Sequence, residues 1–572
     1  MNSNSIIVQE YLSTLKEDRE LDYLFPKLLN LMGYRIVQTA KESKGQSQYG
    51  KDIIAIGKDG RGKLYRWYFE LKGYADRDIS DKNYSATDGI RESIIEARDT
   101  AFSDSTIFGF NSLPVKIVLV HNGVLKTNIR PTFEGFISRE FKNDEFERWD
   151  IYHLTELFSQ FLFNEYLLSD EDSNRLLKKS LAFLDTADYD YTHFKQLVNL
   201  QFDKVNEIRG RAFSKLFATL ALLQTLIFHY SQENNNLVPA KECSKYLILQ
   251  TWAWVLRNKL ENKDRIKREI RNLLEIQFSI FRKYFQTTYP IAKIENGLYY
   301  EHGGFYEEIG YPLRCFNYLD DSIYFCRLLN FRIEDKSIRL KMHSKQKDLL
   351  IDMIENNSGF LRPVLDNHSI PIMQLFLFFA KDGLRQKDVN FISFYIFRVI
   401  NRVCRNKLKY KRLPDLYSRI ELTVEAAATH VKPEEYTDSS SILVAVLLEL
   451  TALFNSRDMF EELLKHMNED LSLQIPNIKF GDYNVEQLIF ERHLHNEYHI
   501  ESIDHLAKST KSLKEEPNFK GFRQDIISKQ KPIPEYRTDK SGFDFLRYLA
   551  HSYYKNEILP EEWRILVKSR ES

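Results

Sequence analysis

Two short apolar stretches joined by a glycine-rich turn constrain this chain more than any other feature. Asp52 comes directly before the apolar run 53–56, and Glu70-Leu71-Lys72 ends the run that begins at Tyr65. The segment 58–62 between them (Lys-Asp-Gly-Arg-Gly) is typical of a hairpin turn, because Asp and Gly readily adopt the backbone conformations that such turns need. The sequence therefore predicts two antiparallel strands.

The spacing of the charged residues predicts where they lie in this hairpin. Residues that pair across a hairpin have a constant sum of positions, and Asp52 and Glu70 are centred on Arg61, inside the turn. We therefore expect the two carboxylates to lie opposite each other on one sheet face, with their Cβ atoms about 5 Å apart. Side chains alternate along a strand, so Lys72 shares the face of Glu70. The opposite, core-forming face should carry Tyr65, Trp67, Phe69 and Leu71.

Two acids and a lysine at one point of a sheet suit the hydrolysis of phosphodiesters better than they suit packing. Mg²⁺ and Mn²⁺ prefer oxygen ligands, which Asp52, Glu70 and the main-chain carbonyl of Leu71 would supply. Such an ion acidifies water and stabilises the charge that develops on the phosphate. Lys72 would orient the water, help to deprotonate it, or neutralise that charge. The alternative interpretation is a solvated cluster of salt bridges on an exposed sheet face.

The first 165 residues alternate helical and extended patterns. Apolar residues at helical spacing predict helices over 21–32, 88–102, 129–142 and 154–167, and apolar runs predict further strands over 34–37, 115–120 and 149–152. With the hairpin, this order predicts a mixed sheet with helices on both faces.

These motifs together resemble the PD-(D/E)xK nuclease superfamily, and more closely its Mrr-like restriction endonuclease group. The resemblance is carried in order by Asp22 in the first helix, Gly33-Tyr34 at its end, Gly50-Lys51-Asp52, Glu70-Leu71-Lys72, and the strand-to-turn segment 118–123. It covers less than a third of the chain. It implies an α/β restriction-endonuclease-like domain over 1–168 in which Asp52, Glu70 and Lys72 are catalytic.

Three further residues are weaker candidates for this site. Asp22 would make an outer-sphere or second-metal contact, although Glu20 is a competing acid and a plain solvated helix face explains both. Gln46 and Gln48, just before Asp52, would position the phosphate or the waters of the metal. Polar loop residues without a role in the site are the alternative interpretation of both glutamines.

The remainder of the chain is predicted to be almost entirely helical from about residue 173. We expect a helical sensing or interaction region over 172–506, then a polar connection and a terminal helical segment over 507–572. A basic stripe recurs every three or four residues on one face of a helix predicted over 391–412. Phosphate contacts with nucleic acid are one interpretation of this stripe, and ion pairs with Glu434 and Glu435 are the other. Its members are Arg398, Arg402, Arg405 and Lys409.

Composition restricts the setting in which the protein acts. Basic and acidic residues balance at 81 each over 572 residues, so a nucleic-acid surface would be a local patch. The four cysteines are scattered without a paired motif, which favours a reduced, cytoplasmic protein. The longest apolar runs are too short or too polar to span a bilayer, so we expect no membrane partner.

The expected function is that of a Mg²⁺- or Mn²⁺-dependent endonuclease that acts on DNA, with RNA not excluded. A small nuclease domain on a long helical region is similar in layout to gated effectors of antiphage defence and restriction. The helical region would then sense a signal, bind a partner protein or form a homo-oligomer. The alternatives are a DNA-repair nuclease, and a non-catalytic nuclease-fold scaffold whose helices bind a partner protein.

Overall fold

The computed structural model describes most of the chain as two compact units. The described residues are 3–39, 50–142, 144–163, 167–186, 189–205, 210–299, 306–439, 441–467, 485–490, 519–528 and 535–555. The first unit comprises Met1–Leu247 and Arg271–Ile276, and the second comprises Ile248–Ile270 and Gln277–Ser572.

A five-stranded mixed sheet forms the centre of the first unit. The strands lie side by side in sequence order: β1 (Arg35–Gln38), β2 (Ile53–Lys58), β3 (Leu64–Lys72), β4 (Val115–His121) and β5 (Phe146–Trp149). The first three strands pair antiparallel, and β4 and β5 are added in parallel. The predicted mixed sheet is confirmed.

The hairpin of β2 and β3 has the predicted register. The pairing runs from Lys58 with Leu64, beside the turn, to Ile53 with Phe69 at the far end. Asp52 and Glu70 are the next residues beyond Ile53 and Phe69, so they occupy facing positions. The Asp59 side chain stabilises the turn, since its Oδ1 accepts the N–H groups of Arg61 at 3.0 Å and Lys63 at 2.8 Å. The turn is therefore held by its own sequence.

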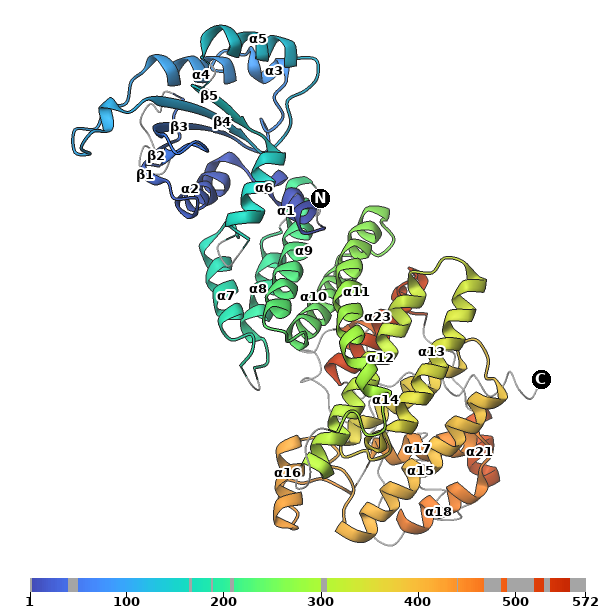
Figure 1. Ribbon diagram of the computed structural model, residues 1–572. Helices are drawn as coiled ribbons and strands as arrows, with labels where there is room; N and C mark the ends of the chain where they lie inside the picture. Colours follow the sequence, from blue (N-terminus) through green and yellow to red (C-terminus); the bar gives the residue numbers. More distant parts are fainter. Residues whose placement is uncertain are drawn as a thin grey trace. The chain divides into compact units, whose positions relative to one another are not determined.

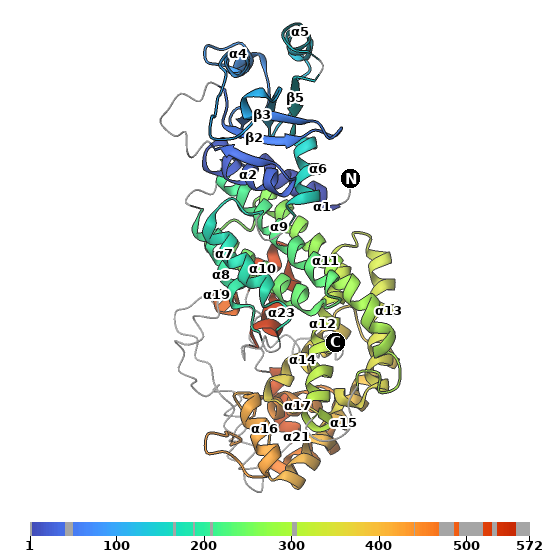
Figure 2. The same ribbon diagram turned by 60° about the vertical axis from the view of Figure 1, so that its left-hand side comes forward.

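Helices cover both faces of the sheet (Figures 1 and 2). On one face, Phe69 contacts Phe25 at a ring-centroid distance of 5.2 Å and Trp149 at 5.5 Å. On the other face, Ile54 and Tyr68 belong to a core with residues of α4 and α5. The helices and single turns before the sheet ends are α1 (Ser3–Ser13), η1 (Glu17–Leu21), α2 (Asp22–Leu31), α3 (Asp81–Tyr84), α4 (Ile90–Asp99), η2 (Phe110–Ser112) and α5 (Arg130–Glu140).

The strand predicted over 149–152 is wrong in its position. β5 ends at Trp149, and α6 (Ile151–Phe161) begins two residues later. Asp150 separates the two elements, because its carboxylate accepts the N–H groups of Tyr152 and His153 and so caps the helix. The prediction assigned Ile151 and Tyr152 to a strand because they are apolar. The Asp150 cap instead makes them the first residues of a helix.

The first unit extends well beyond the predicted boundary at residues 168–172. It also contains α7 (Glu171–Ala182), α8 (Thr192–Asp203) and α9 (Gly210–Glu233). Helix α9 contacts α1, and Lys215 of α9 lies 2.8 Å from Glu20, which Arg211 also contacts. These ion pairs and helix contacts bring the first helices after residue 170 into the same unit as the sheet.

The second unit is helical in all its described residues apart from turns. Helices α10 (Val238–Arg257) and α11 (Asp264–Ala292) contribute to both units. The remaining elements are η3 (Tyr306–Gly310), α12 (Tyr311–Phe331), α13 (Lys336–Asn356), η4 (Ser358–Leu361), η5 (Asp366–His368), α14 (Ser369–Ala380), α15 (Gln386–Tyr410), α16 (Ile420–Thr429), α17 (Ile442–Leu453), α18 (Arg457–Met467), α19 (Val485–Phe490), α21 (Phe519–Ser528), α22 (Arg537–Lys540) and α23 (Asp544–Tyr554).

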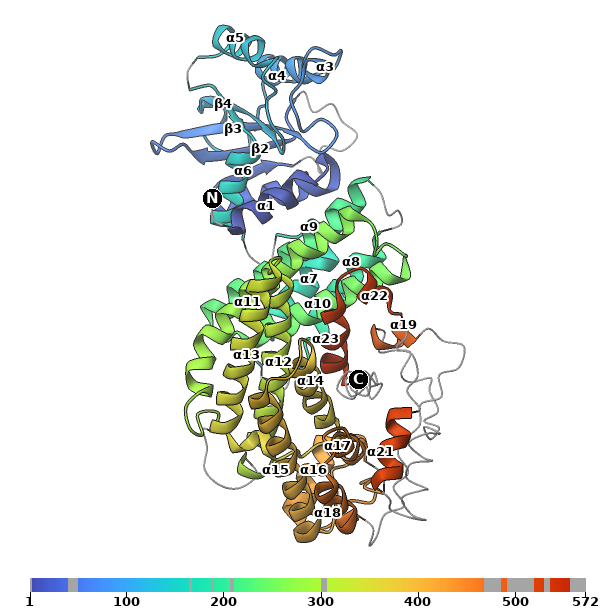
Figure 3. The same ribbon diagram turned by 90° about the vertical axis from the view of Figure 1, so that its right-hand side faces the viewer.

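The C-terminal helices belong to this unit and do not form the separate segment predicted over 507–572. Helix α23 contacts α12 and α14 (Figure 3). Trp252 Nε1 of α10 donates a hydrogen bond of 3.0 Å to Thr538 of α22. Helix α23 is the helix of the predicted terminal segment, and contacts with α12 and α14 bury its apolar side.

The expectation that the apolar runs are too short or too polar to span a bilayer is wrong for one described helix, which by length and composition could cross a membrane. This helix is α9, and 72% of its most apolar window is buried in the structure. Such burial is the property of a core helix. All four cysteines are free thiols, and three of them are buried.

Candidate functional site

Glu70 and Lys72 form an ion pair at the end of β3. Lys72 Nζ lies 2.7 Å from Glu70 Oε1, and Glu70 is only 4% exposed. The intervening Leu71 is fully buried on the opposite, core-forming face. Strand alternation therefore brings the acid and the lysine together on the same side of the sheet.

Asp52 lies opposite this pair, directly before β2 as expected. β2 begins one residue later, at Ile53. The Asp52 N–H donates to the Phe69 carbonyl at 2.9 Å, and Asp52 Oδ2 accepts the N–H of Leu71 at 2.7 Å. The Asp52 carboxylate thus takes the place of a main-chain acceptor where the pairing of β2 and β3 ends. This hydrogen bond orients the carboxylate, and Asp52 is only 8% exposed.

Electrostatics at this point of the sheet favour the uptake of positive charge. Burial and the nearby Glu70 carboxylate raise the pKa of Asp52 well above its ordinary value, against the lowering effects of the Leu71 N–H and Lys72. Burial alone would lower the pKa of Lys72, but Glu70 and Glu17 raise it. The carboxylates are therefore held close together at a cost that a bound cation would relieve.

Glu17 is a third acid of this site that the sequence did not reveal. Its Oε1 lies 3.6 Å from Lys72 Nζ, so Lys72 contacts two carboxylates. Burial raises the pKa of Glu17, with Glu70 adding to the effect and Lys72 opposing it. A Cβ atom on Gly73 would lie 2.2 Å from the Glu17 main-chain nitrogen, so only glycine permits this approach of η1 to β3. Within the charged run 16–20, no sequence signal singles out Glu17.

Lys51 is a second residue of the site that the sequence analysis did not select. It is buried, and its Nζ lies 3.5 Å from the Glu96 carbonyl of α4. Burial lowers the pKa of Lys51 to about 8, against the opposing charges of Glu96 and Glu70. Its position next to Asp52 was the available signal, but an isolated lysine in a loop carries no pattern.

Asn122 ties the end of β4 to the segment that precedes Glu17. The side chain is fully buried, and its Nδ2 donates to the carbonyls of Leu12 at 2.7 Å and Leu15 at 2.8 Å. Its main-chain N–H donates to the Lys72 carbonyl at 3.3 Å. The strand-to-turn segment 118–123 therefore has a structural role beside the candidate site.

Replacing Asn122 by alanine is expected to destabilise the first unit by about 2–3 kcal/mol, because two buried carbonyls lose their donors. Urea-induced unfolding followed by circular dichroism measures this loss. Asn30→Ala, on the exposed surface of α2, serves as the control. Equal stability of the Asn122 and Asn30 variants would contradict the assigned role.

The structure does not add the weaker candidates, Asp22, Gln46 and Gln48, to this site. Asp22 begins α2 and is partly buried. Among the described residues, no three His, Cys, Asp or Glu side chains form a group that could hold a metal ion, so Asp22 does not complete a three-carboxylate site with Asp52 and Glu70. Gln46 and Gln48 lie outside the described residues.

The donor set at the hairpin nevertheless fits a hard divalent cation. Asp52 and Glu70 supply carboxylate oxygens from facing positions, and the Leu71 carbonyl is the third oxygen of the predicted set. Mg²⁺ is commonly bound through only one or two carboxylates, with water and substrate phosphate in its other positions. The residues present therefore match the cation that the sequence predicted.

The raised pKa of Asp52 predicts that Asp52→Asn stabilises the metal-free protein. The folded state holds this proton more tightly than the unfolded chain, so stability falls as pH rises above the ordinary carboxyl pKa. Asparagine keeps the oxygen that accepts the Leu71 N–H but cannot ionise. We expect a gain on the order of 1 kcal/mol or more at pH 7.

Chemical denaturation in EDTA at several pH values measures this effect. The stability gain of Asp52→Asn should grow as pH rises from about 4 towards neutrality. Asp99→Asn is the control of opposite sign, because Arg98 lowers the pKa of Asp99. A loss of stability in Asp52→Asn at pH 7 would contradict this prediction. It would show that the Leu71 N–H and Lys72 stabilise the ionised carboxylate more than burial and Glu70 destabilise it.

The basic stripe predicted over 391–412 lies on α15, in the second unit. Its buried side is as predicted: Ile396, Val399, Ile400 and Val403 are all buried. The ion-pair interpretation holds only for Lys409, and with another acid than those named: Lys409 lies 4.0 Å from Glu308, whereas Glu435 pairs with Arg419 at 3.7 Å. Arg402, Arg405 and Lys409 line a cavity, whereas the exposed Arg398 does not.

Comparison of the chain with protein-family models, with curated proteins and with solved structures finds no match. A function for this chain therefore has to be argued from the geometry and chemistry of its own residues.

Proposed function

We propose that the first unit is a metal-dependent endonuclease of the PD-(D/E)xK type, with a restriction-endonuclease-like fold, which hydrolyses phosphodiester bonds of DNA. One observation carries this proposal. Glu70 and Lys72, 2.7 Å apart, lie at the end of β3, and the buried carboxylate of Asp52 is hydrogen-bonded to the residue between them. A solvated salt-bridge cluster would not bury both acids.

Each residue of this group has a distinct role in the proposal. Asp52 and Glu70, with the Leu71 carbonyl, would hold Mg²⁺ or Mn²⁺. When bound, the ion supplies an acidified water and neutralises charge on the scissile phosphate. Lys72 donates hydrogen bonds from its ammonium to the attacking water or a phosphate oxygen. Glu17, 3.6 Å from that ammonium, helps Glu70 to position it.

We further propose that cleavage is gated, as suits an effector of antiphage defence or restriction acting in the cytoplasm. The support is the amount of helical structure, which far exceeds what a nuclease domain needs. The four free thiols suit a reducing compartment. The helical unit would receive the signal from a partner protein, a second copy of the chain or a small molecule.

A cleavage assay of the full chain tests the proposal. The protein is incubated with Mg²⁺, Mn²⁺ or EDTA on supercoiled plasmid, linear duplex DNA, single-stranded DNA and RNA. Beside it, Glu70→Gln removes one metal ligand without a change in size. Glu134→Gln, on exposed α5, removes the same charge away from the site. We expect metal-dependent cutting of DNA that persists in the control and disappears in Glu70→Gln.

Metal binding measured by calorimetry separates the remaining outcomes. Binding that Glu70→Gln abolishes, without cutting, would indicate a gated enzyme that lacks its signal. Neither binding nor cutting would overturn the proposal and favour a non-catalytic scaffold. Cutting of RNA alone would replace DNA as the substrate.

A further inference from the structure

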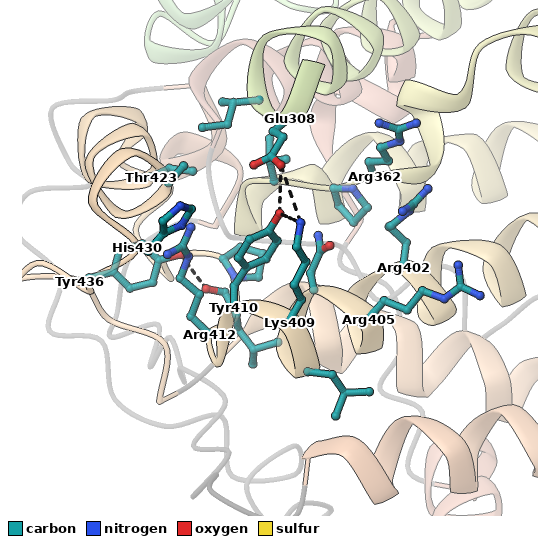
Figure 4. Close-up of a pocket in the computed structure, with 18 of the residues that line it drawn as sticks. Glu308, Arg362, Arg402, Arg405, Lys409, Tyr410, Arg412, Thr423, His430 and Tyr436 are labelled. Carbon is teal, nitrogen blue, oxygen red and sulfur yellow. Dashed lines mark hydrogen bonds and ion pairs between the residues drawn. The ribbon is translucent and has the colours of Figure 1, made fainter. Parts of the chain in front are cut away.

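The second unit contains a cavity of about 960 Å³ beside the C-terminal half of α15. Its walls come from η3, the segment 362–364, the end of α15, the segment 412–414 and α16. All of these belong to the second unit, so the cavity lies within one compact body. Its lining combines basic and aromatic side chains (Figure 4).

Positive charge dominates this cavity. Two acids, Glu307 and Glu308, stand against five basic side chains in its lining, which are Arg362, Arg402, Arg405, Lys409 and Arg412. Figure 4 shows Arg362, Arg402 and Arg405 together on one side. Like charges this close repel one another even where water partly screens them, and a bound anion would relieve that repulsion.

The three clustered arginines lack acidic partners among the described residues. Arg402 and Arg405 form no ion pair there, and Arg362 makes a 3.0 Å hydrogen bond to Ser358 while its buried Nε has no partner. Partial burial and the charges of Arg362, Arg405 and Arg398 lower the pKa of Arg402. Planar guanidinium groups in this state are suited to phosphate oxygens.

The opposite side of the cavity carries aromatic side chains. The Tyr410 hydroxyl lies 3.0 Å from Glu308 and 2.6 Å from Lys409 Nζ, so this acid is engaged within the wall. Figure 4 shows Arg412, His430 and Tyr436 on the same side as Tyr410. Flat aromatic rings facing a phosphate-binding cluster suit a molecule that has a flat, partly apolar portion.

The dimensions decide between a small molecule and a nucleic-acid backbone. Small-molecule sites enclose roughly 300–1,000 Å³, and this cavity lies at the upper end of that range. A nucleic-acid backbone would instead contact a continuous exposed stripe, which would include Arg398. Arg398, Arg405 and Lys409 are all exposed, but of these three only Arg398 lies outside the cavity.

We propose that this cavity binds a phosphorylated small molecule of nucleotide size with two or more adjacent phosphates. Arg362, Arg402 and Arg405 contact the phosphates, and Tyr410 and His430 contact the remainder of the molecule. This assignment does not depend on the nuclease proposal, because it rests on the second unit alone. It gives the helical unit a ligand-binding site.

Calorimetric titration of the full chain with ATP and with pyrophosphate tests this site. The Arg402→Gln/Arg405→Gln double variant removes two guanidinium groups without removing an ion pair of the described residues. Arg398→Gln is the matched control, since it makes the same change on the same helix outside the cavity. Arg362→Gln is a second, independent probe.

We expect ATP to bind the wild-type chain, with at least about tenfold weaker binding in the double variant and in Arg362→Gln. Arg398→Gln should bind like the wild type. Tighter binding of ATP than of pyrophosphate would support contacts of the aromatic side with the nucleoside. Equal binding would support the arginine contacts as the main source of affinity.

Three results would overturn the proposal. The first is that neither ATP nor pyrophosphate binds, although thermal unfolding shows a folded protein. The second is equal weakening in Arg398→Gln and the double variant. The third is that a short duplex DNA, and not ATP, loses affinity in the double variant, which would assign the arginines to a nucleic-acid surface.

Discussion

Replacing Lys72 by methionine is expected to reduce the proposed DNA cleavage by roughly a hundredfold to ten-thousandfold, while metal binding persists. Lys72 brings the only ammonium that contacts Glu70 and Glu17 directly among the described ion pairs. Methionine retains much of the apolar side chain but cannot donate a hydrogen bond. Asp52 and Glu70 remain available to a cation, so calorimetry should still detect Mn²⁺.

Lys116→Met is the matched control for this experiment. Lys116 is likewise a lysine of the sheet paired with an acid, Glu147 at 2.7 Å, but it is buried and lies near the start of β4. Its replacement should leave cleavage within about twofold of the wild type once stability is matched. Similar activity of the Lys72 and Lys116 variants would remove Lys72 from the proposed catalytic group. Loss of metal binding in Lys72→Met would instead assign it a structural role.

Replacing Gly50 by alanine is expected to destabilise the first unit by roughly 3 kcal/mol, through backbone strain and overpacking together. Gly50 has a φ of +68°, a conformation that alanine adopts only with strain. A Cβ atom there would lie 2.0 Å from the Ser93 carbonyl oxygen of α4, so the helix or the loop has to move. Because Lys51 and Asp52 follow directly, such a movement should also weaken metal binding.

Gly33→Ala separates the two components of this effect. Gly33 also has a positive φ, +87°, but a Cβ atom there would meet no atom within 4 Å. Its replacement should therefore cost only the strain of the backbone, about 1 kcal/mol, and leave metal binding unchanged. Urea-induced unfolding of both variants gives the comparison. Equal losses would show that α4 yields to the added methyl group.

The hairpin was predictable because its determinants are local. Asp59 and the glycines around it specify a turn, and strand alternation then carries Glu70 and Lys72 to the same face. The mixed sheet followed from the order of the elements. The expected nuclease activity and its Mg²⁺ requirement stay predictions, as they depend on chemistry that geometry alone does not test.

The rest of the candidate site depends on contacts between distant parts of the chain. Glu17 reaches Lys72 because Gly73 allows η1 to approach β3 and because Asn122 holds the preceding carbonyls. Glu20, which looked equivalent in sequence, instead pairs with Lys215 of α9. The same run of charges thus supplies one acid to the site and another to helix packing.

The basic stripe illustrates the same limit in the second unit. Helical spacing correctly placed Arg398, Arg402 and Arg405 on one exposed side of α15, because a helix has a fixed period. Helical spacing did not show which of these arginines line a cavity. Arg402 and Arg405 line a cavity that η3 and α16 complete, whereas Arg398 lies outside it.

The sequence by itself therefore determined the hairpin, the facing positions of Asp52 and Glu70, and the side of the sheet that carries Lys72. Turn chemistry and the two-residue period of a strand act over a few residues, so they can be read without the fold. Only the tertiary structure decided that Glu17 and Lys51 join these residues and that three arginines line one cavity. Those outcomes depend on how separate helices pack, which no local pattern encodes.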